Sequence, residues 1–312
     1  MRILVTGGMG FIGHNVVSQL EDLGHDVEII DSLTDYGIIP KDELSRLIDE
    51  RSSQLSATCH LHDISSKGHG IDTLFRTFKP ETVIHLVSIP NQKIAGFAPV
   101  ISARTMTEGL LNICEQSRQY NVKRFVYISS SMVYGDFADG VREDATCSPA
   151  GLYGILKLAG ERLVEDYSRR GSFEHVIIRP SAVYGPRDIK DRVISKFLWA
   201  AMLDEVLTVN GSDESLDFSY VDDVASGIVG ASLSDATAGK TYNITRSRSR
   251  SLLEAAELAV RIAGKGRIEV KDRDKNFPQR GLLNIDAARI DFGFEPKIDL
   301  EEGLQLYYEY LM

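Results

Sequence analysis

The feature that most constrains the fold is the run ILVTGGMGFIG at Ile3–Gly13. Its first residues, Ile3–Val5, are aliphatic and β-branched, which is typical of a strand buried on both faces. Four glycines follow directly, and apolar residues then recur at helical spacing over Phe11–Leu23. A strand, a glycine-rich turn and a helix in this order predict a dinucleotide-binding unit. In such a unit the backbone approaches a pyrophosphate at the helix N-terminus.

An acidic residue stands where such a unit needs one. A second expected strand, Val27–Ile30, ends in Asp31, about 20 residues after the glycine turn, where a carboxylate binds the adenosine ribose hydroxyls. The same carboxylate would repel a 2′-phosphate, so Asp31 favours NAD over NADP. The alternative interpretation is a purely structural glycine turn.

The first half of the chain alternates strand and helix patterns. This predicts an α/β fold with a doubly wound, parallel sheet of the Rossmann type. The expected strands are Arg2–Thr6, Val27–Ile30, Thr58–Leu61, Val83–Val87, Phe125–Ser129 and Val176–Arg179. The expected helices are Phe11–Leu23, Lys41–Leu55, Ile71–Phe78, Val100–Tyr120 and Leu152–Arg170.

After Pro186 the pattern loosens and predicts a smaller C-terminal α/β lobe. We therefore expect an NAD-binding domain over 1–180 that carries the catalytic residues. A mainly substrate-binding lobe is expected over 181–312, with some of its segments returning to the first domain. The expected elements there are the helices Val193–Leu203, Val221–Leu233, Leu252–Ala263 and Leu300–Leu311 and the strand Leu207–Val209. Ser251 and Glu254 form a capping-box pattern for the third of these helices.

The net charge indicates which classes of partner are not expected, and the cysteines indicate the cellular compartment. The 35 basic and 45 acidic residues give a net charge of −10, which argues against nucleic acid or an anionic membrane as a partner. Cys59, Cys114 and Cys147 lack metal-ligand spacing, so we expect reduced thiols and a cytoplasmic location. No membrane span or signal peptide is expected. His60 and His62 alternate on a strand but lack a third ligand, so no metal is expected.

Candidate catalytic residues follow the fifth expected strand. Tyr153 and Lys157 are four residues apart on an expected helix and therefore share a face. A phenol with a pKa of about 10 is a poor base, but a nearby ammonium group stabilises the phenolate. Ser130, at the ligand-binding edge of the sheet, would hydrogen-bond the substrate oxygen. Taken separately, Tyr153 and Lys157 would be interpreted as a surface pair and Ser130 as a turn residue. Their combination in a chain that also carries a dinucleotide-binding motif favours a catalytic role.

These residues lie in stretches by which the sequence resembles the extended short-chain dehydrogenase/reductase superfamily. Within it, the resemblance is to the nucleotide-sugar epimerase/dehydratase branch, which includes UDP-glucose 4-epimerase-like enzymes. The matching stretches are TGGMGFIG at 6–13, HDI at 62–64, HLVS at 85–88, SSSMVYG at 129–135, YGILK at 153–157, RPSAVYGPRD at 179–188 and DFSYVDDVASG at 217–227.

The resemblance implies NAD as the cofactor and a set of contacts to it. It places Gly7, Gly10, Phe11, Ile12 and Gly13 at the pyrophosphate, Asp31 and Ser32 at the adenosine ribose, Asp63 and Ile64 at the adenine, and Leu86, Val87 and Ser88 on the path to the nicotinamide. Tyr153 is implied as the acid/base and Lys157 as its partner, both also touching the cofactor, with Ser130 as the catalytic serine.

The resemblance also implies a nucleotide-diphosphate sugar as substrate and a homodimer formed through two helices of each subunit, here Val100–Tyr120 and Leu152–Arg170. Ser130, Ser131, Met132 and Tyr153 would contact the substrate.

Three positions depart from the family pattern. Ala182 and Met106 stand where the family usually has asparagine, and Leu216 stands where it often has arginine. The nucleotide end of the substrate is therefore expected to be held differently or to differ from uridine diphosphate. Arg187 and Arg280 are candidate replacements for the diphosphate contacts, with exposed surface arginines as the alternative.

The two residues after the catalytic serine limit the type of reaction that the site is expected to catalyse. Ser131 and Met132 stand where related dehydratases carry an acidic pair and decarboxylases a glutamate, so elimination of water is disfavoured. The leading hypothesis is an NAD-dependent nucleotide-sugar 4-epimerase acting through a transient 4-keto intermediate. The alternative is a net 4-oxidoreductase on the same substrates, and a third hypothesis is a non-catalytic NAD-binding sensor.

Overall fold

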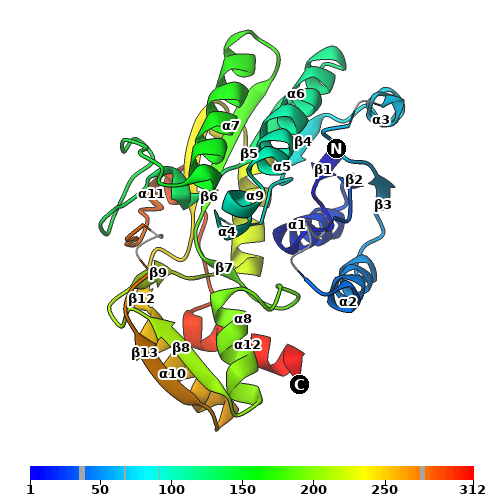
Figure 1. Ribbon diagram of the computed structural model, residues 1–312. Coiled ribbons are helices and arrows are strands. Elements are labelled where there is room, and N and C mark those ends of the chain that lie inside the picture. Colours follow the sequence, from blue (N-terminus) through cyan, green and yellow to red (C-terminus); the bar gives the residue numbers. More distant parts are fainter. Residues whose placement is uncertain (35–38, 67, 91, 275–277) are drawn as a thin grey trace.

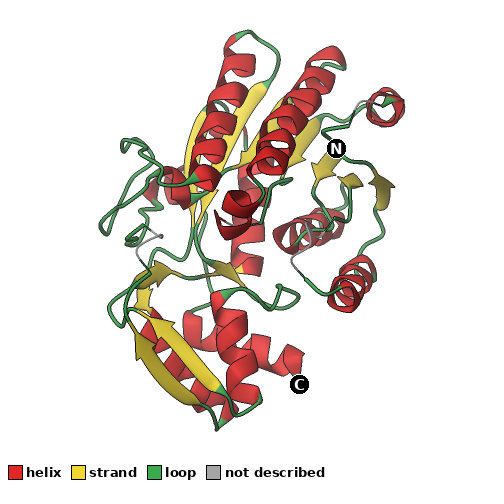
Figure 2. Cartoon of the chain, viewed as in Figure 1, coloured by secondary structure: helices red, strands yellow, loops and turns green. Residues whose placement is uncertain are grey.

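The structure is a computed structural model that describes residues 1–34, 39–66, 68–90, 92–274 and 278–312. A seven-stranded parallel sheet forms its centre (Figures 1 and 2). The strands are β1 (Arg2–Thr6), β2 (Asp26–Asp31), β3 (Thr58–Leu61), β4 (Thr82–His85), β5 (Arg124–Ile128), β6 (Glu174–Pro180) and β11 (Lys240–Ile244). Their order, β11-β6-β5-β4-β1-β2-β3, is that of a doubly wound nucleotide-binding sheet with one strand added beyond β6.

The parallel sheet confirms the expected fold class, and all six expected strands are present. β4 ends at His85, earlier than predicted, so Leu86, Val87 and Ser88 lie in the loop at the carboxyl edge. The seventh strand, β11, pairs in register with β6 although it comes long after residue 180. The switch point of the sheet lies between β1 and β4, where ligands bind in such folds.

Helices cover both faces of the sheet. Val16 of α1 (Phe11–Asp22), Ile228 of α9 (Val221–Leu233) and Ala288 of α11 (Asp286–Phe292) belong to the core cluster on one face. On the other face, α3 (His69–Phe78), α6 (Gly109–Gln119) and α7 (Leu152–Arg169) bury side chains that include Phe75, Ile113 and Val164. Figure 1 shows α6 and α7 side by side across this face. Burying each such side chain contributes about 1.5–3 kcal/mol.

The region predicted as one helix over Val100–Tyr120 is interrupted. It consists of α5 (Pro99–Ala103), a π-helical turn at Arg104–Glu108 and α6, preceded by the short helix α4 (Gln92–Phe97). The π turn buries Thr105 and Met106, and such turns are frequent at functional sites.

Segments after residue 192, apart from α9, β11 and α11, build a smaller lobe below the sheet in Figure 1. Its parallel strand pair is β8 (Val206–Asn210) and β13 (Arg267–Lys271), covered by α8 (Val193–Met202), α10 (Leu252–Ala263) and α12 (Leu300–Leu311). The Ser251 side chain accepts a hydrogen bond from the Glu254 amide at 3.0 Å, as the capping pattern predicted. Short strands join the two lobes: β7 (Val183–Tyr184) with β10 (Ser219–Tyr220), and β9 (Ser215–Asp217) with β12 (Ser249–Ser251).

The remaining helix of the sheet domain, α2 (Lys41–Ser52), lies beside β2 and β3 (Figure 1). None of the helices in the described part of the chain has the length and apolar character needed to cross a bilayer.

Candidate active site

The turn after β1 is closed by backbone contacts that require glycine. Gly7 has a φ of +76°, and a Cβ atom there would lie 2.9 Å from the Val87 nitrogen. A Cβ atom on Gly13 would lie 2.2 Å from the Gly7 carbonyl oxygen. The turn leads into α1, whose N-cap Gly10 offers no side chain to hydrogen-bond the first amides. Free amides at the positive end of the helix dipole can receive a phosphate group.

A cavity lies in front of this turn at the carboxyl edge of the sheet. Its wall contains ten of the predicted cofactor contacts: Gly7, Gly10, Phe11, Asp31, Ser32, Asp63, Ile64, Leu86, Val87 and Ser88. Ile12 instead packs against the hydrophobic core, and Gly13, in the first turn of α1, packs against the Gly7 carbonyl. Lys157 is buried and Tyr153 half-buried beside the wall that Ser88 forms.

Asp31 is fixed at the end of β2 by the glycine turn itself. Its carboxylate accepts hydrogen bonds from the Met9 amide at 3.0 Å and the Leu33 amide at 2.9 Å. Burial raises the pKa of Asp31, and these hydrogen bonds oppose that rise. The glycine turn, the uncapped helix terminus and this carboxylate together fit an adenine dinucleotide.

A buried arginine that the sequence did not single out completes this cavity. Arg51, near the end of α2, is only 7% exposed and lines the cavity. Its guanidinium donates to the Met9 carbonyl at 3.1 Å and to the Arg187 carbonyl at 2.6 Å. Arg51 therefore ties the glycine turn to the loop that follows β7.

The structure brings the three predicted catalytic residues together. Ser130 follows β5 and caps the 3₁₀ turn Ser131–Val133, accepting from the Met132 amide at 3.2 Å. Tyr153 and Lys157 lie one turn apart on α7, and the Lys157 Nζ is 5.9 Å from the centre of the Tyr153 ring. This Nζ donates to the Ile128 carbonyl at 2.7 Å, which holds the lysine against the end of β5.

Burial is the largest influence on the pKa of Tyr153 and on that of Lys157. Burial raises the pKa of Tyr153, while Arg192 and hydrogen bonds with Ser88 and Ser130 lower it. Burial also lowers the pKa of Lys157 to about 7, against the opposing charge of Glu161. The pKa shifts of Tyr153 and Lys157 therefore run in opposite directions, and positive charge near Tyr153 is what favours its phenolate form.

A buried ion pair supports α7 against the sheet. Glu161 of α7 is fully buried, and the Arg179 guanidinium donates to its two carboxylate oxygens at 2.9 and 2.7 Å. Arg179 also donates to the Tyr134 hydroxyl at 2.9 Å, and the Ser129 hydroxyl donates to Glu161. Because Glu161 is four residues after Lys157 on the same helix face, its charge also favours the protonated lysine.

The residues predicted to contact the substrate do not all lie in the same part of the structure. Ser131 and Met132 lie buried beside Ser130, with the Ser131 hydroxyl donating to the Ser181 hydroxyl at 3.1 Å. Arg280 is half-buried within electrostatic reach of Arg192. Burial, and then the positive charge of Arg192, lower the pKa of Arg280 to about 10.

Arg187, the other predicted diphosphate contact, does not lie with these residues. It turns at a φ of +64°, and its guanidinium stacks over the Tyr310 ring at 5.4 Å. It lines a separate cavity with residues of α1 and the start of α9, including Asn15 and Asp222.

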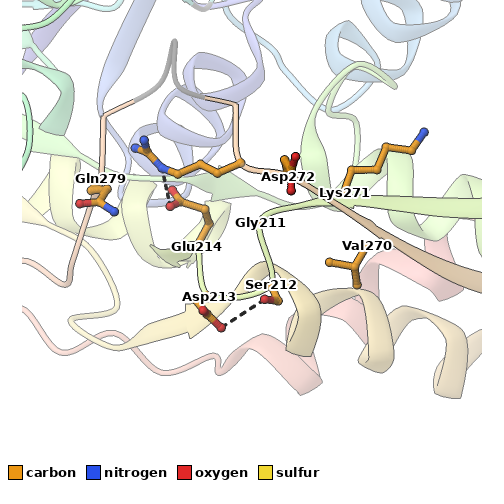
Figure 3. A pocket seen from close by; sticks show the side chains of 9 residues that line it. Gly211, Ser212, Asp213, Glu214, Val270, Lys271, Asp272 and Gln279 are labelled. Atoms are coloured by element: carbon orange, nitrogen blue, oxygen red, sulfur yellow. Dashed lines mark hydrogen bonds and ion pairs between the residues drawn. The ribbon is translucent and has the colours of Figure 1, made fainter.

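A further cavity of about 730 Å³ lies in the smaller lobe, at the ends of β8 and β13. It is lined by Gly211, Ser212, Asp213, Glu214, Val270, Lys271, Asp272, Arg273 and Gln279 (Figure 3). Glu214 pairs with Arg273 at 2.6 Å across it. Gln279 of its wall directly precedes Arg280 in the chain.

The model of the NAD dependent epimerase/dehydratase family matches residues 3–245. The chain belongs to this family. It is an NAD-dependent enzyme of the extended short-chain dehydrogenase type, and NAD is the cofactor that the cavity beside the glycine turn fits.

Relatives of this family member match along its whole length. A Bacillus subtilis protein, the uncharacterized UDP-glucose epimerase YtcB, is 29% identical over 100% of this chain and 98% of its own. A Thermotoga maritima UDP-glucose 4-epimerase crystallised with UDP-glucose aligns with a TM-score of 0.88 at 28% identity, covering 100% of this chain and 98% of that one. A Bacillus cereus UDP-glucuronic acid 4-epimerase with UDP-glucuronic acid and NAD gives a TM-score of 0.90 at 27% identity, covering 100% and 99%.

The three positions that depart from the family pattern lie in different parts of the fold. Ala182, where asparagine is usual, has a φ of 37°, which asparagine adopts more readily than alanine. Met106 is buried in the π turn and packs with Ile89 and Leu156 of the cluster beside the triad. Leu216 lies in β9 and packs against the core of the smaller lobe.

Proposed function

We propose that the chain is a nucleotide-sugar 4-epimerase that acts through a transient 4-keto sugar. The observation that carries the proposal is the meeting of Ser130, Tyr153 and Lys157 beside the dinucleotide cavity. The positions after Ser130 hold Ser131 and Met132, so neither carries a carboxylate for elimination of water. The relatives crystallised as 4-epimerases, one with UDP-glucose and one with UDP-glucuronic acid, support the same reaction.

The roles of the side chains follow from their contacts. Tyr153, as phenolate, accepts the proton of the 4-hydroxyl and later returns it. Ser130 hydrogen-bonds the same sugar oxygen and keeps it beside the phenol, and Lys157 stabilises the phenolate charge. NAD, when bound, supplies the reversible hydride transfer at carbon 4.

The nucleotide end of the substrate is proposed to extend into the smaller lobe. Gln279, on the wall of the cavity of Figure 3, directly precedes Arg280 in the chain, and the Arg280 guanidinium is suited to bind the diphosphate that follows the sugar. The wall of this cavity is polar, with Asp213 and Asp272 able to accept hydrogen bonds and Gln279 able to donate them. The lobe formed mainly by 181–312 is thus the proposed substrate-binding part.

The direct test is incubation of the purified protein with UDP-, GDP-, dTDP- and CDP-sugars, followed by separation of the 4-epimers. We expect one nucleotide class to give a 4-epimer without net consumption of cofactor. Stoichiometric build-up of reduced cofactor would instead indicate the 4-oxidoreductase, and no product from any sugar, with NAD bound, would contradict the proposal.

A homodimer is proposed from an exposed apolar surface. Phe97, Val100, Ile101 and Ile155 are 89%, 79%, 53% and 50% exposed, and they come from α4, α5 and the start of α7, which contact one another. Exposed apolar residues gathered in this way are typical of an interface between subunits. The expected cytoplasmic location remains a prediction.

Phe97→Glu combined with Val100→Glu is expected to convert the dimer to monomer, because two carboxylates per subunit cannot be buried without partners. Size-exclusion chromatography with light scattering measures the mass. The matched control is Ile290→Glu, which changes an 81% exposed residue on α11 and should leave the mass unchanged. A wild-type protein that is monomeric at micromolar concentration would contradict the proposal.

A further inference from the structure

The surroundings of the Asp31 carboxylate would suit a phosphate group equally well. Its two oxygens accept hydrogen bonds from the Met9 amide at 3.0 Å and from the Leu33 amide at 2.9 Å. Backbone amides that converge on one point are common donors of anion-binding sites. The Asp31 side chain therefore occupies, from within the chain, a place that has the hydrogen-bond donors of an anion site.

Arg51 adds a buried positive charge at this place. Its Nη1 donates to the Met9 carbonyl at 3.1 Å, while the Met9 amide donates to Asp31, so the backbone of Met9 joins the two side chains. Both Arg51 and Asp31 line the dinucleotide cavity. The described residues leave the buried Nε of Arg51 without a hydrogen-bond partner. A buried donor without a partner costs free energy, so it favours a ligand that supplies an acceptor.

Met9 places these groups at the adenosine end of the cofactor. It stands between Gly8 and Gly10 of the turn that receives the pyrophosphate, and its amide binds the carboxylate that meets the ribose hydroxyls in such folds. NADP carries its extra phosphate on the 2′ oxygen of this ribose. Its 2′-phosphate would therefore come to the place where the Asp31 carboxylate lies.

We propose that the Asp31 carboxylate fills a latent phosphate site, formed by two backbone amides and the Arg51 guanidinium. Removal of this one carboxylate opens the enzyme to NADP, and Arg51 then binds the 2′-phosphate. Ser32 and Thr34 line the same cavity and add hydroxyl donors. The inference rests on NAD as the cofactor and is independent of the proposed epimerisation.

The other carboxylates of the cavity wall have different partners. The negative charge of Asp188 also acts on Arg51, but its carboxylate lies 3.9 Å from the Arg192 Nε. Asp63 accepts hydrogen bonds from the amide and the hydroxyl of the serine two residues after it, both at 2.8 Å. Asp31 is therefore the carboxylate whose removal releases an amide donor of the glycine turn.

The test is a competition between NAD and NADP for one site. The purified protein is dialysed against equal concentrations of both until the bound ratio is constant, and the bound nucleotides are then released and separated by chromatography. We expect the wild type to hold NAD. Asp31→Ala should shift the ratio toward NADP by about a hundredfold, because a repulsion is removed and a charged hydrogen bond is gained, each worth about tenfold.

Arg51→Gln in the Asp31→Ala background should reverse this shift by about tenfold, whereas Arg51→Lys, which keeps the charge, should retain most of it. A merely structural role of Arg51 would weaken the binding of both nucleotides alike and leave their ratio unchanged. The matched control is Glu50→Gln, which removes a carboxylate from the same helix. Glu50 pairs with Arg46 at 2.6 Å outside the cavity, so this variant should keep the wild-type ratio.

An unchanged ratio in Asp31→Ala would overturn the proposal, as would a folded Asp31→Ala protein that binds neither nucleotide. A shift toward NADP that persists in full after Arg51→Gln would overturn the role of Arg51. Asp31→Ser repeats the test if the alanine variant does not fold, because a serine hydroxyl can still accept from the Leu33 amide. No sugar is present in the experiment, so a wrong assignment of the substrate does not affect its result.

Discussion

Tyr153→Phe lowers the turnover number for 4-epimerisation by about 10² to 10⁴-fold, the usual contribution of a positioned general acid/base. Phenylalanine keeps the ring that packs with Leu156 and Met106 but removes the hydroxyl that interacts with Ser88 and Ser130. The measurement is kcat on the best substrate of the nucleotide-sugar panel, with the NAD content per chain determined in parallel.

The control for this variant is Tyr120→Phe. It removes a phenol that donates to Asp72 at 2.8 Å at the end of α6, does not line the dinucleotide cavity, and should leave kcat unchanged. If Tyr153→Phe kept more than about a tenth of the wild-type turnover, a loss below even the smallest contribution expected of a general base, Tyr153 would be removed from the mechanism.

Gly13→Ala is expected to abolish NAD retention and to destabilise the fold. The added Cβ atom would meet the Gly7 carbonyl oxygen at 2.2 Å and the Gly8 Cα at 2.9 Å, so the turn must open. Both obstructing atoms belong to the backbone, and overpacking of this kind costs about 1–3 kcal/mol. Opening the turn also moves the amides that receive the phosphate. The measurements are NAD content after purification and the free energy of unfolding in denaturant.

Gly96→Ala is the matched control, because Gly96 is also helical but a Cβ atom there meets nothing within 4 Å. It should retain NAD and stability. Full retention of NAD by Gly13→Ala would show that cofactor binding does not depend on this turn and would contradict the role assigned to it.

The sequence predicted the parts of the site whose residues lie close together along the chain. The strand–turn–helix unit at Ile3–Gly13 needs only local geometry, because a buried strand and tightly packed glycines leave little choice of conformation. Tyr153 and Lys157 were found by helical spacing, and Ser130 by its place after a strand that ends at the ligand-binding edge. Each of these is a short-range pattern, which is why the triad could be assembled before the structure was known.

The missed parts depend on contacts between distant segments. β11 (Lys240–Ile244) is a short strand with a lysine and an asparagine, and its hydrophobic pattern alone does not say that it pairs with β6. Arg51 and Arg192 look like surface charges in sequence, and only the folded loop after β7 brings both to the dinucleotide cavity. The π turn at Arg104–Glu108 was missed because its residues continue the helical periodicity.

The different positions of the two candidate arginines also depend on the fold and not on a local sequence pattern. Arg187 and Arg280 were chosen for their residue type in the absence of the family's usual contacts. The fold places Arg280 beside Arg192, whereas the left-handed turn at Arg187 directs that side chain over Tyr310. Their charge alone therefore did not show which of the two arginines lies near the site. The backbone conformation at Arg187 did.

The most direct test of the proposed epimerisation is incubation of the NAD-loaded protein with the best substrate of the nucleotide-sugar panel, deuterated at carbon 4, followed by mass spectrometry and NMR of the products. We predict a 4-epimer that keeps its deuterium at carbon 4, because the same atom is removed and returned within one closed site. A 4-epimer in which solvent hydrogen has replaced the deuterium would contradict the proposal, as would a released 4-keto sugar in place of any epimer.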